Sequence, residues 1–427
     1  MHTSEPVHHL GIPAHLLSFE ASHSAAHARL QAVNPRAYAN TRNQLDGAVT
    51  GLSPYFTHGM LGLTQAAGAL HKRQPLSFED KLVFEFGWRE FFHHVWQHAG
   101  DNGDAILRDM QGAAPWHGTY ADSVPADIRE GRTGVAAIDS AIRVLYETGY
   151  LHNHARMWLA SYVVHLRKVH WRAGADWLYG HLLDGDLPSN HLSWQWVAGT
   201  FSSKPYLFNA DNVLKYAPAA QRHAWASPGS VIDQSYEALD ALARGRGDVG
   251  PERGRHASVD EPALSDRFHL PFMPLPLVNG MPLAINNIAG CVVELIHPWS
   301  LSLRAASAEI ELAKTPWRIG IIHLPGHARL PWSERRWRFV LQAMAAVTDT
   351  VWIGDVGLLD LSTASYVSAQ STLFPGYRDV LIAATRTGKL TPAPRLMPDP
   401  AMRCASFSKF YERVRREVGQ FSRLLEQ

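Results

Sequence analysis

The chain is poor in cysteine and in long apolar runs, and it has no excess charge of either sign. Two cysteines among 427 residues exclude a disulfide framework and a four-cysteine iron–sulfur site. No apolar run reaches about eighteen residues, and no basic segment precedes an apolar one at the amino terminus, so neither a membrane span nor secretion is expected. With a formal net charge of +1, any polyanionic partner must meet a local basic patch. We expect a cytoplasmic protein with reduced thiols.

Sequence motifs for several common chemistries are also missing. The 24 histidines include no His-Glu-x-x-His segment and no Cys/His quartet, so no metal site is predicted. No Gly-x-Ser-x-Gly elbow is present, which excludes the usual α/β hydrolase. The segment Gly354-Asp-Val-Gly357 lacks the third glycine of a dinucleotide fingerprint and indicates only a turn between a strand and a helix.

The order of patterns along the chain predicts two domains of different class. Over residues 19–226 apolar side chains recur at three- and four-residue spacing, which predicts an all-helical domain spanning residues 1–226. Residues 227–276 are rich in Gly, Arg and Pro and are interpreted as a linker. Residues 277–427 alternate short apolar runs with amphipathic segments, which predicts a small doubly wound parallel sheet of the Rossmann-like type.

This second domain is predicted in detail. Its expected strands are Val292–Ile296, Ile319–His323, Thr350–Ile353 and Asp379–Ile382. Its expected helices are Ser300–Lys314, Ser333–Val347, Ser362–Leu373 and Ser406–Leu425.

Three clusters in the helical part combine polar and aromatic side chains. Tyr38 to Asn43 and Thr50 to Tyr55 place hydroxyl groups before a helix, where free backbone N–H groups could hold phosphate or simply be capped. Glu85, Trp88 and Arg89 share one helical face, which suits a base-like partner or a surface ion pair beside a core tryptophan.

The third cluster, Tyr150 to Thr200, is the most specific. Its polar members are Asn153 and Arg156, followed by Asp184, Asp186 and Asn190 around a Gly-Asp turn. Buried amides and carboxylates need partners. Either a heteroaromatic ring or hydrogen bonds within the protein would satisfy them.

Together with Glu130-Gly-Arg-Thr-Gly134, these segments resemble the flavin-binding helical domain of the photolyase/cryptochrome family over about residues 30–218. The resemblance implies FAD as the cofactor. It implies that Thr50 and Ser53 contact phosphate and that Tyr38 begins the flavin site. The remaining residues that it places around the flavin are Arg89, Asn153, Arg156, Asp184, Asp186 and Asn190. Among these, Arg156 would pair with Asp184 near the isoalloxazine ring, Asp186 would lie by its polar edge, and Asn190 would face N5.

The resemblance also implies a pocket for a flipped-out cyclobutane pyrimidine dimer. Its residues would be Glu85, Trp88, Asn153, Met157 and Trp196, with Glu85 and Asn153 acting in catalysis. Relatives that repair the other major photoproduct usually have histidines at the positions of Asn153 and Met157, so cyclobutane dimers are favoured. UV-damaged DNA is the expected partner.

Trp194 and Trp171 match the first two members of the tryptophan chain that carries electrons to the flavin in this family. The third member would fall near Gly118, where Trp116 or Tyr120 could replace it. His154 stands where photolyases often have an arginine that holds the DNA backbone, and Tyr150 replaces a common tryptophan.

The architecture departs from the family, in which an α/β antenna domain ordinarily precedes the flavin domain. Here the α/β part follows, as a possible permuted antenna-like domain, and no antenna chromophore is assigned. The leading hypothesis is blue-light-driven repair of cyclobutane dimers by a carbon–carbon lyase that uses reduced FAD. Two alternatives stay open, namely a cryptochrome-like photoreceptor that signals through its carboxyl-terminal domain, and a flavin-free nucleic-acid-binding relative.

Overall fold

The computed structural model describes residues 7–100, 107–247, 258–266, 277–279, 288–303 and 315–426. The chain divides into two compact units, each assembled from three stretches of sequence. The first unit comprises Met1–Phe19, Val33–Gly51 and Ala105–Ala263, and the second comprises Glu20–Ala32, Leu52–Asp104 and Leu264–Gln427.

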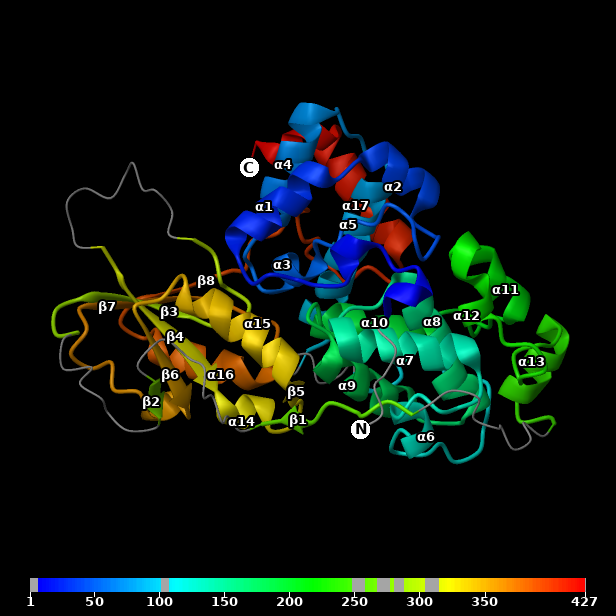
Figure 1. The fold of residues 1–427 in the computed structure, drawn as a ribbon. Coiled ribbons are helices and arrows are strands. Elements are labelled where there is room, and N and C mark those ends of the chain that lie inside the picture. The colour runs from blue at the N-terminus through cyan, green and yellow to red at the C-terminus, as the bar shows by residue number, and fades with distance from the viewer. Residues whose placement is uncertain are drawn as a thin grey trace. The chain divides into compact units, whose positions relative to one another are not determined.

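The first unit is helical (Figure 1). Its α-helices are α2 (Pro35–Thr41), α6 (Ala126–Arg129), α7 (Ala136–Thr148), α8 (Asn153–Ser161), α9 (Trp171–His181), α10 (Leu187–Ala198), α11 (Ala210–Tyr216), α12 (Arg222–Trp225) and α13 (Tyr236–Ala243). Short 3-10 turns η1 (Val7–Leu10), η2 (Ala14–Leu16) and η5 (Ala219–Gln221) and a π-helical turn η4 (Tyr162–Leu166) complete it.

Short-range hydrogen bonds and glycine residues fix the ends of α7 and α10. Asp139 on α7 accepts hydrogen bonds from the backbone N–H groups of Thr133 and Gly134, so the Glu130–Gly134 motif folds onto the helix that follows it. Gly149 and Gly199 end α7 and α10 with φ of 68° and 85°, a conformation that glycine adopts without steric cost.

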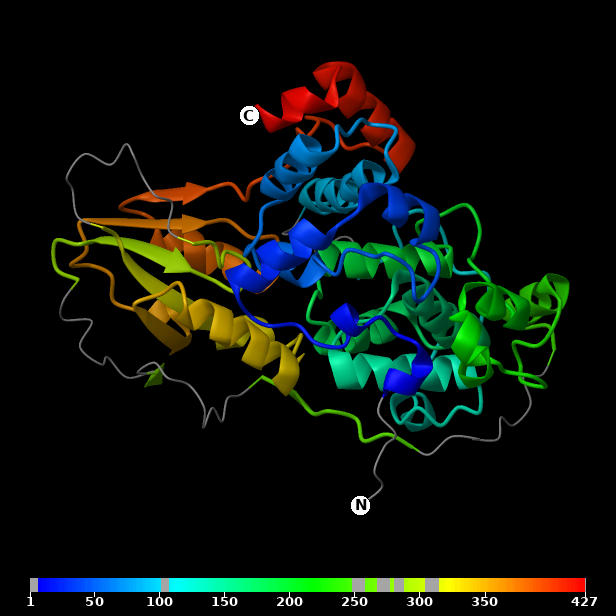
Figure 2. The ribbon, with the colours of Figure 1, turned by 45° about the horizontal axis from the view of Figure 1, so that its top comes forward.

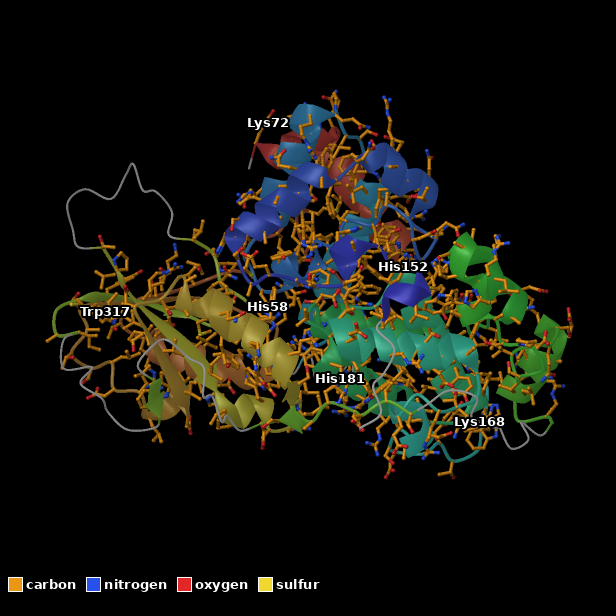
Figure 3. All side chains as sticks on the ribbon, viewed as in Figure 1. His58, Lys72, His152, Lys168, His181 and Trp317 are labelled. Carbon is orange, nitrogen blue, oxygen red and sulfur yellow. The ribbon has the colours of Figure 1, made fainter. Side chains whose placement is uncertain are left out.

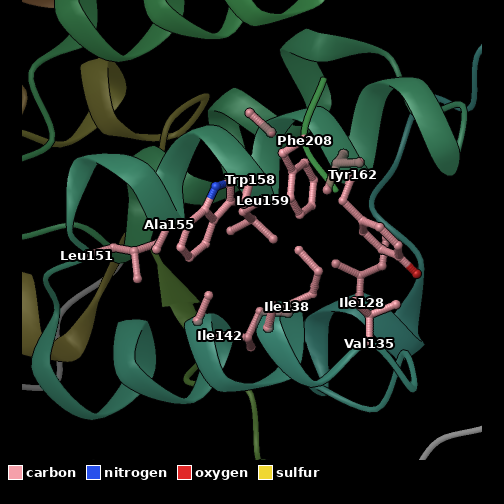
Figure 4. Packing of buried hydrophobic residues seen from close by; sticks show 14 of the residues in the cluster. Ile128, Val135, Ile138, Ile142, Leu151, Ala155, Trp158, Leu159, Tyr162 and Phe208 are labelled. Carbon is pink, nitrogen blue, oxygen red and sulfur yellow. The ribbon is translucent and has the colours of Figure 1, made fainter. Parts of the chain in front are cut away.

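Large aromatic side chains fill the space between α7 and α8. Trp158 and Phe208 stack there with ring centroids 6.2 Å apart, against Ile138 and Ile142 from α7 (Figure 4). Burial of such rings is the main stabilising contribution of this core.

The second unit contains a six-stranded parallel sheet in the order β2–β6–β4–β3–β7–β8. These strands are β2 (Leu277–Asn279), β3 (Val292–Ile296), β4 (Trp317–His323), β6 (Thr350–Gly354), β7 (Tyr366–Gln370) and β8 (Lys389–Thr391). The chain runs from β3 to β6 in one direction and resumes at β7 on the other side of β3. Right-handed crossovers then place α15 (Glu334–Ala345) and α16 (Pro375–Ala384) on opposite faces of the sheet (Figure 2).

Further helices and a small ribbon belong to the second unit. They are α1 (His23–Ala32), α3 (Ser53–Thr57), α4 (Leu63–Arg73), α5 (Lys81–Gln97), α14 (Leu324–His327), α17 (Phe407–Val418), η7 (Val356–Leu358), η8 (Phe421–Leu425) and the antiparallel pair β1 (Leu264–Ser265) and β5 (Trp332–Ser333).

The predicted fold class, helical plus doubly wound α/β, is confirmed, but two of its elements were wrong. The predicted helix Ser362–Leu373 contains strand β7, in which alternate residues, Val367 and Ala369, are buried. The predicted strand Asp379–Ile382 lies within helix α16. A strand buried on both faces would have covered Ile382, which is 48% exposed. Predicted helix Ser300–Lys314 falls largely outside the described residues, and helix α13 lies inside the segment that was interpreted as a linker.

Candidate functional site

An ion pair between a buried carboxylate and a partly buried guanidinium joins α8 to the loop before α10 in the first unit. Arg156 donates through Nη2 to both carboxylate oxygens of Asp184, at 3.0 and 2.7 Å, and through Nε to the Leu151 carbonyl at 2.6 Å. Its guanidinium lies 5.3 Å from the centre of the Tyr150 ring. Burial alone would lower the pKa of Arg156, but the Asp184 carboxylate raises it above its ordinary value. The pair is therefore a fixed charged group.

Two more predicted residues lie at the start of α10. The Asp186 carboxylate caps this helix by accepting from the backbone N–H of Ser189 at 3.1 Å and from its hydroxyl. The Asn190 side chain donates to the Ala175 carbonyl of α9 at 2.9 Å. Both side chains are more than nine-tenths buried, so a carboxylate and an amide are presented within a largely apolar region.

The first turns of α8 carry two more predicted residues, Asn153 and Met157. Asn153 is exposed, and its Nδ2 lies 3.5 Å from Sδ of Met157 one turn later. His152, labelled in Figure 3, caps the helix by accepting from the backbone N–H of His154 at 3.1 Å. The other ring nitrogen of His152 therefore donates to the Arg42 carbonyl at 3.0 Å.

His154 carries no charge at neutral pH. Burial, with a further contribution from Arg42, lowers its pKa to about 4. A neutral ring thus stands where the resemblance leads one to expect an arginine, so phosphate contacts at this position would lack a cation.

The predicted phosphate residues are split between the units. In the first unit, Tyr38 lies on α2 and Thr50 in the irregular segment after it, and both are half-buried. In the second unit, Ser53 is the first residue of α3, a helix of five residues.

In the second unit, α5 presents Glu85, Trp88 and Arg89 as one half-buried group, as their spacing predicted. The partner of Trp88 was not predicted from the sequence. Its ring stacks on Phe407 of α17 with centroids 4.1 Å apart and an angle of 7° between the planes. The Trp88 indole is thus covered on one face by the carboxyl-terminal helix.

A histidine cluster follows on the same helix. Asp399 accepts from Nδ1 of His94 at 2.6 Å and from Nε2 of His98 at 3.2 Å, a geometry that resembles three metal ligands. Nε2 of His94, however, accepts the backbone N–H of Cys404 at 2.8 Å, so Nδ1 carries the proton and donates it to Asp399. These hydrogen bonds clamp the segment before α17 onto α5 and leave Nδ1 without a lone pair for a metal.

The tryptophans predicted to transfer electrons lie on adjacent helices of the first unit. The Trp194 ring, from α10, packs directly on Gly174 of α9, where a Cβ atom would come within 2.3 Å of it. Trp171 lies one turn before Gly174 on α9, and both indoles are only 2% exposed. Trp196, the predicted pocket wall, is half-buried beside Tyr206, with ring centroids 5.9 Å apart.

The candidates for the third tryptophan position also contact this region. The rings of Trp116 and Tyr120 lie 4.9 Å apart, and Tyr120 contacts His170, whose ring lies 5.6 Å from that of Trp171. Lys168, labelled in Figure 3, places its ammonium 5.4 Å from the Trp116 ring centre. Its Nζ donates to three backbone carbonyls, those of His165, Leu242 and Ala243.

Comparison with known proteins identifies this helical region. Residues 82–242 match the model for the FAD binding domain of DNA photolyase. This part of the chain is therefore similar to the FAD-binding domain of the photolyase/cryptochrome family. The chain is 32% identical over 209 residues to a deoxyribodipyrimidine photo-lyase from Synechococcus sp., an alignment that covers 46% of this chain and 43% of the relative. A deoxyribodipyrimidine photo-lyase from Thermus thermophilus is 35% identical over 207 residues, with 48% of each protein covered.

The similarity is limited to part of each protein, since the chain spans less than half the length of these two curated relatives. A solved structure, a cryptochrome from Synechocystis, superimposes with a TM-score of 0.42 at 24% identity, covering 54% of this chain and 52% of the other. Among the described residues, no helix is both long and apolar enough to cross a bilayer.

The matched family domain binds FAD, and the buried polar groups of the first unit fit that cofactor. The Arg156–Asp184 pair, the Asp186 carboxylate and the Asn190 amide offer both hydrogen-bond donors and acceptors within an apolar region. An isoalloxazine ring has alternating donors and acceptors along one edge and an apolar face, which this set of groups could hold.

Proposed function

We propose that the chain is a light-driven DNA repair lyase that splits cyclobutane pyrimidine dimers with reduced FAD. Arg156 and Asp184 would hold the isoalloxazine ring, Asp186 would bind its polar edge, and Asn190 would face N5. The cofactor-binding roles that the resemblance implies for Tyr38, Thr50, Ser53 and Arg89 remain predictions.

The observation that carries the proposal is the pair formed by Asn153 and Met157. Asn153 is exposed at the start of α8, and its amide lies against the Met157 thioether rather than being used in a core hydrogen bond. An exposed amide can donate to and accept from a pyrimidine edge, and the thioether can pack on its ring. Histidines at these positions would favour the other photoproduct.

Bound FAD, reduced and excited by blue light, would supply the electron that opens the dimer. The protein would bind and orient the lesion and exclude water from it. Asn153 would contact the extruded bases, and Trp196 would provide an apolar wall. For Glu85 and Trp88, hydrogen bonding to the base edge and apolar contact with the dimer remain predictions from the resemblance. Extruding a lesion that is already poorly stacked costs less than extruding a normal pair.

One observation favours the rival function, a photoreceptor without repair activity. Phe407 of α17 covers one face of Trp88, the indole that the resemblance assigns to the lesion. A helix held on that indole in the dark and released in the light would signal through the carboxyl-terminal region.

A repair assay separates the two functions. The full chain, loaded with FAD and reduced, is illuminated with blue light beside an oligonucleotide that contains one cyclobutane dimer. We expect light-dependent loss of the dimer, and we expect Asn153→Ala to slow it by about 1–2 kcal/mol of barrier, roughly tenfold. Intact dimers together with a light-dependent change in proteolysis of residues 227–427 would overturn repair and support signalling.

A further inference from the structure

Trp171, the second predicted member of the electron chain, has a hydrogen-bond partner that neither its motif nor its family role indicates. Its indole Nε1–H donates to Oδ1 of Asp109 at 2.8 Å. The Trp171 ring is 2% exposed, whereas Asp109 lies at the surface of the first unit. The N–H group of the buried indole, from which a proton can be lost, is therefore bonded to a carboxylate that is exposed to solvent.

The position of Asp109 is fixed from α10. The side chain of Gln195, which is fully buried, donates to the Arg108 carbonyl at 2.9 Å and accepts the Met110 N–H at 3.0 Å. One amide thus holds the peptide groups on both sides of Asp109. A further bond, from the Gln111 N–H to the Thr200 carbonyl, extends the attachment. Gln195 stands between Trp194 and Trp196, so the helix that carries the first relay tryptophan also positions the carboxylate of the second.

We propose that Asp109 is the proton acceptor for oxidised Trp171 during photoreduction of the flavin. This inference rests on the proposed FAD site and on electron transfer through Trp194. One electron would leave Trp171 for Trp194 after Trp194 had lost an electron to bound, light-excited FAD. The indole Nε1–H bond of Trp171 then breaks, its proton moves to Oδ1 of Asp109, and a neutral tryptophan radical and a neutral carboxylic acid remain.

This proton transfer has a definite consequence. A radical cation on Trp171 is favoured by the nearby carboxylate but can take its electron back quickly. Once the proton has moved along the 2.8 Å hydrogen bond, return of the electron requires return of the proton as well. Since Asp109 is exposed, it can pass the proton to water. Charge separation would thus be stabilised at Trp171, before any hole reaches Tyr120 or Trp116.

The test is transient absorption of the FAD-loaded full chain after a blue pulse, with Asp109→Asn as the variant. The asparagine oxygen still accepts the indole hydrogen bond but is a very weak base. In the wild type we expect a neutral tryptophan radical whose formation slows in D2O. In Asp109→Asn we expect a radical cation without that isotope effect, and a yield of long-lived charge separation lower by about tenfold.

Two controls separate this role from a structural one. Asp122→Asn, an exposed carboxylate of the same unit, should behave as the wild type. In flavin-free protein, the indole N–H resonance of Trp171 should keep its hydrogen-bonded shift in Asp109→Asn and lose it in Asp109→Ala, which shows that the asparagine variant is folded and still bonded.

The possible results distinguish a failure of the Asp109 role from a failure of the proposed FAD site. If the wild type forms a neutral radical and Asp109→Asn forms the same species with the same lifetime, the role of Asp109 is overturned while the FAD site stands. If the flavin-loaded wild type forms no tryptophan radical, electron transfer through Trp171 is overturned and the role of Asp109 with it. If FAD does not bind, the proposed function itself fails.

Discussion

Both units bury many tryptophans, but they treat the indole N–H groups differently. In the first unit four buried indoles donate to identified acceptors: Trp158 to Asn212, Trp171 to Asp109, Trp177 to Glu261 and Trp225 to the Leu10 carbonyl. In the second unit, Trp337 donates to the Ser265 carbonyl, but the indole nitrogens of Trp96, Trp332 and Trp352 are buried without a hydrogen-bond partner among the described residues.

The presence or absence of an indole acceptor distinguishes tryptophans that could have a further role from those that contribute packing alone. A buried N–H without a partner costs about 1–3 kcal/mol, which the second unit offsets by ring contacts such as that between Trp332 and Trp337, with centroids 4.3 Å apart. In the first unit, two of the four acceptors are carboxylates. A carboxylate beside an indole stabilises positive charge on it, so these tryptophans are suited to oxidation as well as to packing.

The largest expected effect contrasts one tryptophan from each unit. Trp171→Phe should abolish photoreduction of bound FAD, because phenylalanine is much harder to oxidise. Trp352→Phe, in strand β6, should leave photoreduction unchanged and should lower the free energy of unfolding by about 1–3 kcal/mol through lost packing. Flavin absorbance under blue light and urea unfolding measure the two effects. Equal photoreduction in both variants would remove the distinction between the units.

The next effect concerns the partly buried Arg156–Asp184 pair. Asp184→Asn leaves the Arg156 guanidinium without its carboxylate, so we expect a loss of about 3 kcal/mol of unfolding free energy and a large loss of FAD affinity. Urea unfolding of the flavin-free chain separates the first effect from the second, which is measured by titration with FAD.

An exposed pair in the same unit provides the matched control. Asp240→Asn removes the partner of Arg244, and both side chains are more than one-third exposed. Its cost should be at most about 0.5 kcal/mol, with FAD affinity unchanged. A cost for Asp184→Asn as small as this would mean that the pair is solvated and is not a fixed part of the site.

The smallest expected effect is a pH dependence in the first unit. Burial lowers the pKa of His152 to about 3 from the ordinary 6.5. Between these values the unfolded chain binds the extra proton, so this residue reduces stability as pH falls below about 6.5, by about 1.4 kcal/mol per pH unit. His152→Asn keeps a capping oxygen for α8 and removes this contribution. Unfolding curves at pH 7, 6 and 5 should show a shallower loss in the variant, and an unchanged slope would contradict it.

Much of the fold was predictable because hydrophobic periodicity is a local signal. The bounds of strand Val292–Ile296 were predicted to the residue, because a short run rich in β-branched residues is typical of a strand. The exchange of strand and helix over 362–382 shows the limit of such signals. Nothing local around Val367 excludes a helix, and it is pairing with β3 on one side and β8 on the other that makes this segment a strand.

The candidate site was predictable to a similar extent. The resemblance to the photolyase/cryptochrome family implied the Arg156–Asp184 pair, which the structure contains. The partners that motifs do not include were missed: Asp109 on Trp171 and Phe407 on Trp88. Both come from segments far away in sequence, and neither lies in a pattern that marks its role. The sequence contained one indication of the Asp109 contact. Gln195 lies between two tryptophans, and its amide, which the structure buries completely, requires hydrogen-bond partners.

The most direct test of the central claim, that the first unit holds FAD beside oxidisable tryptophans, is the absorption spectrum of the purified chain after incubation with FAD and gel filtration. We predict flavin bands at a ratio of about one FAD per chain, as expected for one such domain, which bleach under blue light in the wild type and persist in Trp171→Phe. A flavin-free spectrum after incubation, or bleaching that is equal in both proteins, would contradict the account.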